Sequence, residues 1–131
     1  MSSVVLDASS LLTLINEESG HETIQQVLSD AVMSSVSLAE VASVLISKHK
    51  LSREEVSQII SELIKSIITF NDEQAYIVGE LEKFNVDEGH KLSIGERSSL
   101  ALGIVLNIPV YTTNNALNEI KWPGLSVTVV K

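Results

Sequence analysis

Short, unbroken apolar runs alternate along this chain with longer stretches in which apolar and polar positions recur at helical spacing. The apolar runs have the length of β-strands, and their lack of polar alternation is typical of strands that are buried on both faces. The expected strands span residues 4–7, 31–36, 67–70, 108–113 and 125–131.

The stretches between these runs repeat apolar residues every three or four positions, which predicts amphipathic helices. The expected helices span residues 10–18, 22–31, 41–50, 56–67, 72–84, 96–107 and 114–120, and residues 85–93 read as a polar connection. Buried strands that alternate with helices form a parallel sheet with helices on both faces. The pattern therefore predicts an α/β fold, a three-layer α/β/α arrangement around a parallel sheet of four to five strands, in a single domain spanning residues 1–131.

A Ser-x-x-Glu spacing precedes several of the expected helices and predicts a capping box, in which both side chains bind free backbone N–H groups. It occurs at Ser19 and Glu22, Ser37 and Glu40, Ser52 and Glu55, and Ser93 and Glu96. On this basis each of these glutamates is expected in the first turn of its helix.

Composition narrows the possible classes of protein. The chain has 131 residues, 44% of them hydrophobic and 20% charged, which is typical of a globular protein. It has no cysteine, which excludes a disulfide framework and a thiolate metal site and suits a reducing cytoplasm. The start lacks the basic segment of a signal peptide, and the apolar runs are too short to cross a bilayer, so we expect a cytoplasmic protein without membrane association.

The net charge of −8 bears on the partners that the protein can bind. An acidic surface does not attract phosphate backbones in general, which disfavours non-specific coating of nucleic acid. A deep site with bound cations would still accept a phosphodiester, and an acidic chain also suits a basic protein partner. Charge alone therefore does not choose between these partners.

Four polar residues stand where a parallel sheet places its ligands, at the carboxyl ends of the strands. Asp7 ends the first expected strand, Glu40 starts the helix after the second, Glu96 starts the helix before the fourth, and Asn114 follows the fourth. We therefore expect them to converge at one edge. Each has a purely structural alternative, since Asp and Asn are favoured N-caps and both glutamates fit a capping box.

Asp7 has the weakest purely structural explanation. Ser9 or Ser10 would cap the following helix without placing a charge at the end of a buried strand, where a carboxylate is costly unless something pairs with it. No Lys or Arg precedes Lys48. The compensating charge is then either a remote residue or a bound cation.

Four segments, VVLDASSLL, SLAEVASVL, LSIGERSSLALG and VYTTNNAL, resemble in order and spacing the four motifs of PIN domains. The chain is most similar to the small VapC-type toxins of toxin–antitoxin pairs, and the resemblance covers essentially its whole length. It implies a Mg²⁺- or Mn²⁺-dependent endoribonuclease that forms a homodimer and is inhibited by a cognate antitoxin occupying the site. Apolar helix faces at residues 44–46 and 59–64 offer surface for the dimer. The acidic site predicts a basic antitoxin tail.

The resemblance places Asp7, Glu40 and Glu96 at the family's three leading acidic positions and Asn114 at the fourth, with Thr112 and Ser9 in support. Asp7 and Glu96 are expected to coordinate the metal directly and Glu40 to bridge or lie beside them. Glu96 stands where the family usually has Asp, and Asn114 stands where it has an acid.

These two departures leave open a second possibility, a catalytically weak PIN-like domain that binds RNA or a protein partner without cleavage. A third, a receiver-like phosphorylation module, requires paired acids after the first strand and a lysine at the end of a late strand. Here Asp7 is followed by Ala-Ser-Ser and the fourth strand ends in Thr-Thr-Asn.

Overall fold

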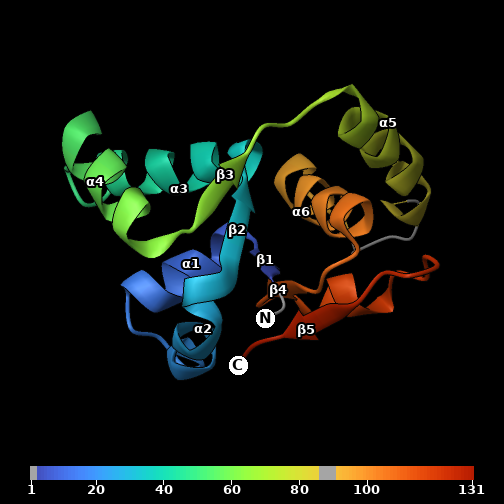
Figure 1. Ribbon diagram of the computed structural model, residues 1–131, viewed down its shortest axis with the longest axis horizontal. Coiled ribbons are helices and arrows are strands. Elements are labelled where there is room, and N and C mark those ends of the chain that lie inside the picture. Colours follow the sequence, from blue (N-terminus) through green and yellow to red (C-terminus); the bar gives the residue numbers. More distant parts are fainter. Residues whose placement is uncertain (1–2, 86–90) are drawn as a thin grey trace.

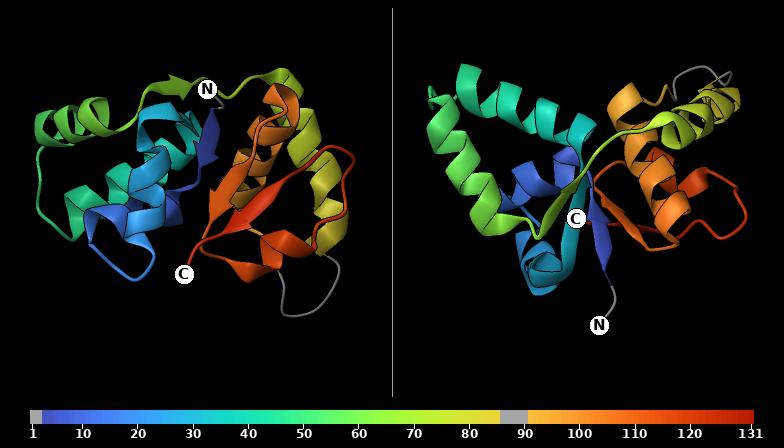
Figure 2. Two further views of the ribbon diagram at one scale, coloured as in Figure 1. Left: turned by 60° about the horizontal axis from the view of Figure 1, so that its bottom comes forward. Right: turned by 45° about the horizontal axis from the view of Figure 1, so that its top comes forward.

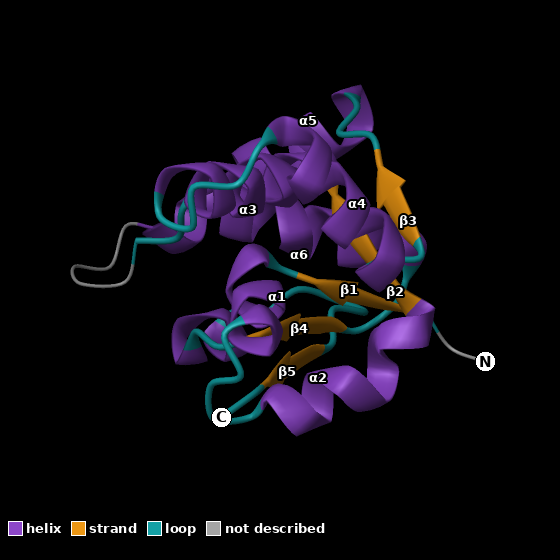
Figure 3. Ribbon diagram, turned by 90° about the vertical axis from the view of Figure 1, so that its left-hand side faces the viewer, coloured by secondary structure: helices purple, strands orange, loops and turns teal. Residues whose placement is uncertain are grey.

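Five parallel strands form the central sheet of the computed structural model, which describes residues 3–85 and 91–131 (Figure 1). The strands are β1 (Val4–Leu6), β2 (Ala31–Ser34), β3 (Ser66–Ile68), β4 (Val110–Thr112) and β5 (Val127–Val129). Their order across the sheet is β3-β2-β1-β4-β5, which can be followed in Figure 3. The chain thus adds strands on one side of β1 and then crosses to the other, so the strand order reverses between β1 and β4.

Six α-helices and three short 3₁₀ segments connect the strands within the described residues. The helices are α1 (Ala8–Ile15), α2 (His21–Val27), α3 (Ser35–Ser47), α4 (Arg53–Leu63), α5 (Asp72–Leu81) and α6 (Ile94–Leu106). The 3₁₀ segments are η1 (Leu28–Asp30), η2 (Glu82–Asn85) and η3 (Asn115–Glu119). None of the described helices has both the length and the apolar character that crossing a bilayer requires.

The sheet separates two apolar cores, because successive side chains of a strand point to opposite faces. In β1, Val4 and Leu6 join the core with α1 to α4, whereas Val5 joins the core with α5, α6 and η3. Figures 1 and 2 show the helices divided between these two sides, with α5 and α6 packed along each other. The predicted three-layer α/β/α architecture with a parallel sheet is confirmed.

The element order also agrees with the prediction, while several boundaries shift by one to six residues. The second expected strand ends at Ser34 instead of residue 36, and the following helix begins six residues earlier than predicted. The third strand lies at 66–68, and the last two strands are shorter than their apolar runs. Most of the expected polar connection at 85–93 lies outside the described residues.

Two of the four predicted capping boxes form, at Ser52 with Glu55 and at Ser93 with Glu96. The box at Ser19 and Glu22 is wrong, because α2 begins after Gly20, whose φ of 96° makes the turn without a side-chain cap. A left-handed backbone of this kind is readily adopted by glycine. The box at Ser37 and Glu40 is also wrong, because α3 starts earlier, with Ser34 as its N-cap.

Candidate active site

Asp7 lies at the end of β1, where it also caps α1. Its Oδ1 atom accepts hydrogen bonds from the backbone N–H of Ser10 (2.9 Å) and from the hydroxyl of Ser9 (2.7 Å). The residue is only 2% exposed. Burial raises the pKa of Asp7, while hydrogen bonds from Thr112, Ser9 and Ser10 lower it in part. Asp7 is therefore both an N-cap and a buried carboxyl group at the strand end.

Glu96 is the third residue of α6 and combines two kinds of contact. Its Oε1 atom accepts the backbone N–H of Ser93 at 2.9 Å, and its own N–H donates to the Ser93 hydroxyl at 3.0 Å, which completes the predicted capping box. Its other carboxylate oxygen, Oε2, accepts a hydrogen bond of 2.7 Å from the side-chain amide of Asn114. These contacts fix the orientation of the carboxylate at the N-terminus of the helix.

Asn114 follows β4 and connects that strand end to Glu96. Its Oδ1 atom accepts the N–H of Ala116 at 3.0 Å, so it caps η3, while its Nδ2 donates to Glu96. Its backbone N–H donates to the Thr112 hydroxyl at 3.1 Å. Thr112 is fully buried and also hydrogen-bonds Asp7. The hydroxyl of Thr112 therefore connects Asp7 to the backbone of Asn114, whose side chain holds Glu96.

Ser9 makes a second link between the ends of β1 and β4. Its hydroxyl donates to Asp7 and accepts the backbone N–H of Thr113 at 3.1 Å. These strands are neighbours at the point where the strand order reverses, which is where ligands bind in open parallel sheets. The side chains expected to converge therefore do so at the predicted edge.

Glu40 approaches the same place from the second turn of α3, not from a capping position at its start. Ser37, predicted to form the box with it, instead pairs its hydroxyl with that of Ser99 in α6 at 3.0 Å. The Glu40 carboxylate lies against Gly95. Its pKa is raised by desolvation first and then by the charges of Asp7 and Glu96, so both of these carboxyl groups disfavour the charged form of Glu40.

The three acids line one pocket of about 250 Å³, together with Ala8, Ser9 and Ser93. The sequence predicts only a capping role for Ser93, and the structure adds that this residue lines the pocket. The signal for this second role was its position three residues before Glu96. Arg97, in contrast, points away from the pocket: its guanidinium donates to the Glu82 carboxylate (3.0 Å) and the Val78 carbonyl (3.3 Å).

The pocket offers oxygen ligands, which suit Mg²⁺ and Mn²⁺. Within residues 3–85 and 91–131, however, no three Asp, Glu, His or Cys side chains form a group ready to hold a metal ion together. Mg²⁺ commonly binds through one or two carboxylates and keeps its remaining positions for water and substrate phosphate. Asp7 and Glu96 are the residues whose carboxylates could hold such an ion.

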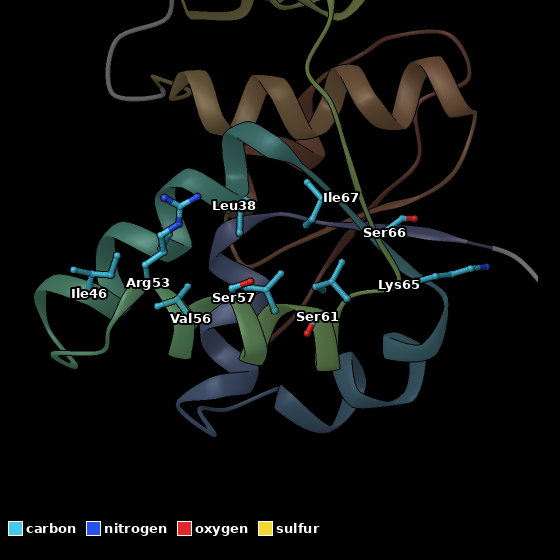
Figure 4. Close-up of a pocket in the computed structure, with 12 residues that line it drawn as sticks. Leu38, Ile46, Arg53, Val56, Ser57, Ser61, Lys65, Ser66 and Ile67 are labelled. Carbon is cyan, nitrogen blue, oxygen red and sulfur yellow. The ribbon is translucent and has the colours of Figure 1, made fainter.

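A larger hollow of about 550 Å³ lies on the other side of α3, between α3, α4 and the start of β3 (Figure 4). Leu38, Ala42 and Ile46, spaced four residues apart, form one wall. Among the described residues that line it, Arg53 and Lys65 are charged and none carries a carboxylate. This apolar groove lacks the ligands for metal chemistry, whereas Glu40 extends from the same helix into the acidic pocket.

Comparison with protein families supplies the identification, because the PIN domain model matches residues 4–123. The chain belongs to the PIN domain family. No curated protein is similar enough in sequence to count as a match.

Solved structures share this PIN fold at low sequence identity. A chain of the DNA-bound VapBC complex from Salmonella typhimurium is 16% identical, with a TM-score of 0.71 and 98% of each chain covered. VapBC2 from Rickettsia felis, bound to a promoter DNA fragment, gives 20% identity, a TM-score of 0.72 and the same coverage. VapC20 from Mycobacterium tuberculosis, a toxin that cleaves the sarcin–ricin loop, is 16% identical with a TM-score of 0.62. The match covers 82% of this chain and 87% of that one.

Proposed function

We propose that this PIN domain is a divalent-metal-dependent endoribonuclease and the toxin of a toxin–antitoxin pair. The observation that carries the proposal is the pocket in which Asp7, Glu40 and Glu96 meet at the reversal point of a parallel sheet. Family membership and the shared fold with VapBC chains support it, and so does the description of VapC20 as a toxin that cleaves the sarcin–ricin loop. In this proposal residues 1–131 act as one domain on cellular RNA in the cytoplasm.

The residues divide the work by how they are held. Asp7 and Glu96 are fixed by hydrogen bonds from Ser9, Ser10, Ser93 and Asn114, so they would hold Mg²⁺ or Mn²⁺ with little loss of side-chain freedom. A bound ion of this kind supplies charge neutralisation at the phosphate and lowers the pKa of water. Such an ion would stabilise the buried carboxylate of Asp7 and the half-buried carboxylate of Glu96, which would give the site its affinity.

Glu40 is the carboxylate suited to proton transfer. Its pKa is raised by desolvation and by its acidic neighbours, and no hydrogen bond from another described residue holds its carboxylate. A raised pKa makes a carboxylate a better acceptor for the proton of an attacking water. In the proposed reaction a water oxygen bonds to phosphorus and its proton passes to a Glu40 oxygen. The bond to the leaving ribose oxygen breaks, its electron pair stays on that oxygen, and the oxygen takes up a proton from solvent.

Thr112 and Ser9 would support this arrangement by holding Asp7. Asn114 would hold Glu96 and bring no charge of its own, so we expect one tightly bound metal ion. A second ion would need the charge of the RNA phosphate to bind, because paired metal sites depend on carboxylates to offset the repulsion between two cations.

A cognate antitoxin is the proposed protein partner. Its basic tail would place an Arg or Lys against Asp7 and Glu96, in the position of the metal. Titration of the purified complex with Mg²⁺ should therefore weaken the binding of the antitoxin. If the affinity of the antitoxin did not change with Mg²⁺, the antitoxin would inhibit at another site.

The apolar helix faces around Ile46 and Ile60, which border the groove of Figure 4, remain the surface proposed for a homodimer.

One contact favours the alternative, a PIN-like domain that binds RNA or protein without cutting. The amide of Asn114 donates to Glu96 Oε2 while Ser93 occupies Oε1, so both oxygens of Glu96 already accept hydrogen bonds. A carboxylate retains further lone pairs, yet these bonds compete with a metal for them.

Cleavage of total RNA with and without metal tests both possibilities. The purified protein is incubated with RNA in chelator, in Mg²⁺ and in Mn²⁺, with Asp7→Asn as the control. The nuclease proposal predicts cleavage only when metal is present, and none by Asp7→Asn. RNA binding without cleavage under every condition would support the alternative, and cleavage by Asp7→Asn in chelator would exclude this site.

A further inference from the structure

Gly95, the second residue of α6, is buried directly beneath the side chain of Glu40. If Gly95 carried a Cβ atom, its three nearest neighbours would all be carboxyl-group atoms of Glu40, with Oε2 at 2.7 Å. Cβ atoms essentially never lie under 3.0 Å from such a neighbour. The carboxylate of Glu40 therefore occupies space that any side chain at position 95 would fill.

This close approach determines where the charge of Glu40 lies. Glu40 originates on α3, and resting on the first turn of α6 brings its carboxylate beside Glu96 and Asp7. The first turn of a helix also carries partial positive charge from its free N–H groups, which favours a carboxylate there. A displaced Glu40 would extend from α3 toward solvent.

We propose that Gly95 is a positioning residue, whose missing side chain lets the Glu40 carboxylate rest on α6 within the acidic pocket. The inference builds on the proposed nuclease function and adds a residue that acts through Glu40 without touching substrate. It predicts that alanine at position 95 disturbs the site and leaves the fold intact, because the end of a flexible side chain moves more easily than packed backbone.

Two other helical glycines provide matched controls. An added Cβ at Gly79 in α5 meets nothing within 4 Å. At Gly103, in the same helix as Gly95, it would overlap the Val110 side chain and lie 3.1 Å from the carbonyl of Ile108. Gly79→Ala should therefore change neither stability nor activity adversely, whereas Gly103→Ala should lower the melting temperature by forcing α6 away from β4.

The experiment compares the three alanine variants with Glu40→Ala and with the double variant Glu40→Ala/Gly95→Ala. Melting temperature, Mn²⁺ affinity by calorimetry and the rate of RNA cleavage are measured for each. Gly95→Ala should melt at or above the wild-type temperature, since alanine is the better helix former. Its metal affinity and cleavage rate should fall by roughly 10–100-fold, the loss typical for removing support around a metal site.

The double variant separates a positioning role from a general disturbance of α6. If Gly95 acts only through Glu40, adding Gly95→Ala to Glu40→Ala should change neither affinity nor rate further, so the two effects are not additive. Equal losses with and without Glu40 would overturn the proposal, and so would wild-type cleavage and affinity in Gly95→Ala.

A crystal structure of metal-free Gly95→Ala gives an answer that does not depend on activity. The Glu40 carboxylate should have left the pocket there and remain in place in Gly79→Ala. An unmoved Glu40 would refute the positioning role even if the protein is a nuclease. If the wild type neither binds Mn²⁺ nor cuts RNA, the proposed function fails, and the position of Glu40 still decides the role of Gly95.

Discussion

Replacing Asp7 by Asn should stabilise the metal-free protein. Asp7 is 2% exposed and its hydrogen-bond partners are uncharged hydroxyl and amide groups, so no cation within the described residues neutralises its buried negative charge. Asn retains an Oδ1 acceptor for Ser9 and Ser10 and is as good an N-cap as Asp. The substitution therefore removes the charge and preserves the hydrogen bonds from Ser9 and Ser10.

The sign of the pH dependence follows from the direction of the pKa shift. Burial raises the pKa of Asp7 in the folded state, so folding favours the protonated form. Stability from this group is fully present below its unfolded pKa, about 3.9, and is lost as pH rises through the folded value. The stability that Asp7→Asn gains over the wild type should be absent in acid, grow with rising pH and then level off. The pKa of Glu40 is also raised, so its contribution to the stability of the fold decreases with rising pH in both proteins.

Divalent metal should reverse the order of stability, so that the wild type melts at a higher temperature than Asp7→Asn. A ligand at one hundred times its Kd stabilises the folded state by about 2.7 kcal/mol. For a domain of this length, 1 kcal/mol corresponds to about 3–5 °C in Tm, which gives the wild type an increase of about 8–13 °C. Asp7→Asn lacks a charged ligand and should gain much less. Asp7→Ala should lose about 0.5–2 kcal/mol from the missing cap, which offsets its gain from the lost charge.

Thermal melts across pH, with chelator and with Mg²⁺, measure these differences. Asp72→Asn is the matched control, because Asp72 is exposed in the first turn of α5. Neutralising it removes a favourable interaction with the helix dipole of about 0.3–1 kcal/mol and should lower the Tm slightly. The reasoning would be refuted if metal-free Asp7→Asn melted below the wild type at every pH, or if Mg²⁺ stabilised both proteins equally.

The remaining predictions concern Glu96, which has a matched counterpart in Glu55, and Asn114. Glu96→Ala should lower both stability, by about 0.5–2 kcal/mol, and cleavage, whereas Glu55→Ala breaks the equivalent box in α4 and should lower stability alone. If both variants cleaved RNA at the same rate, Glu96 would act only as a helix cap. Glu96→Asp keeps the charge and should retain cleavage above that of Glu96→Ala. Asn114→Ala should slow cleavage less than Asp7→Asn, which a rate measurement on folded protein checks, and an equally complete loss would make Asn114 essential.

The layered architecture could be predicted from sequence because it depends on local apolar patterning. Runs such as 4–7 and 31–36 are too apolar to face water, so the chain must cover both faces of the sheet with helices. The boxes at Ser52 and Ser93 could also be predicted, since each needs only residues three positions apart. The same spacing failed at Ser19 and Ser37, because a helix starts where the preceding turn or strand ends, and Gly20 and Ser34 decide that point.

The sequence by itself also named the acids, through the order of four short motifs. Only the tertiary structure decided how they are held. The Ser37 and Ser99 hydroxyls, 62 residues apart in the chain, meet between α3 and α6, and this packing places Glu40 over Gly95. The amide of Asn114 reaches Glu96 across a separation of 18 residues. Such contacts depend on how whole helices pack against the sheet, and local spacing carries no record of that packing.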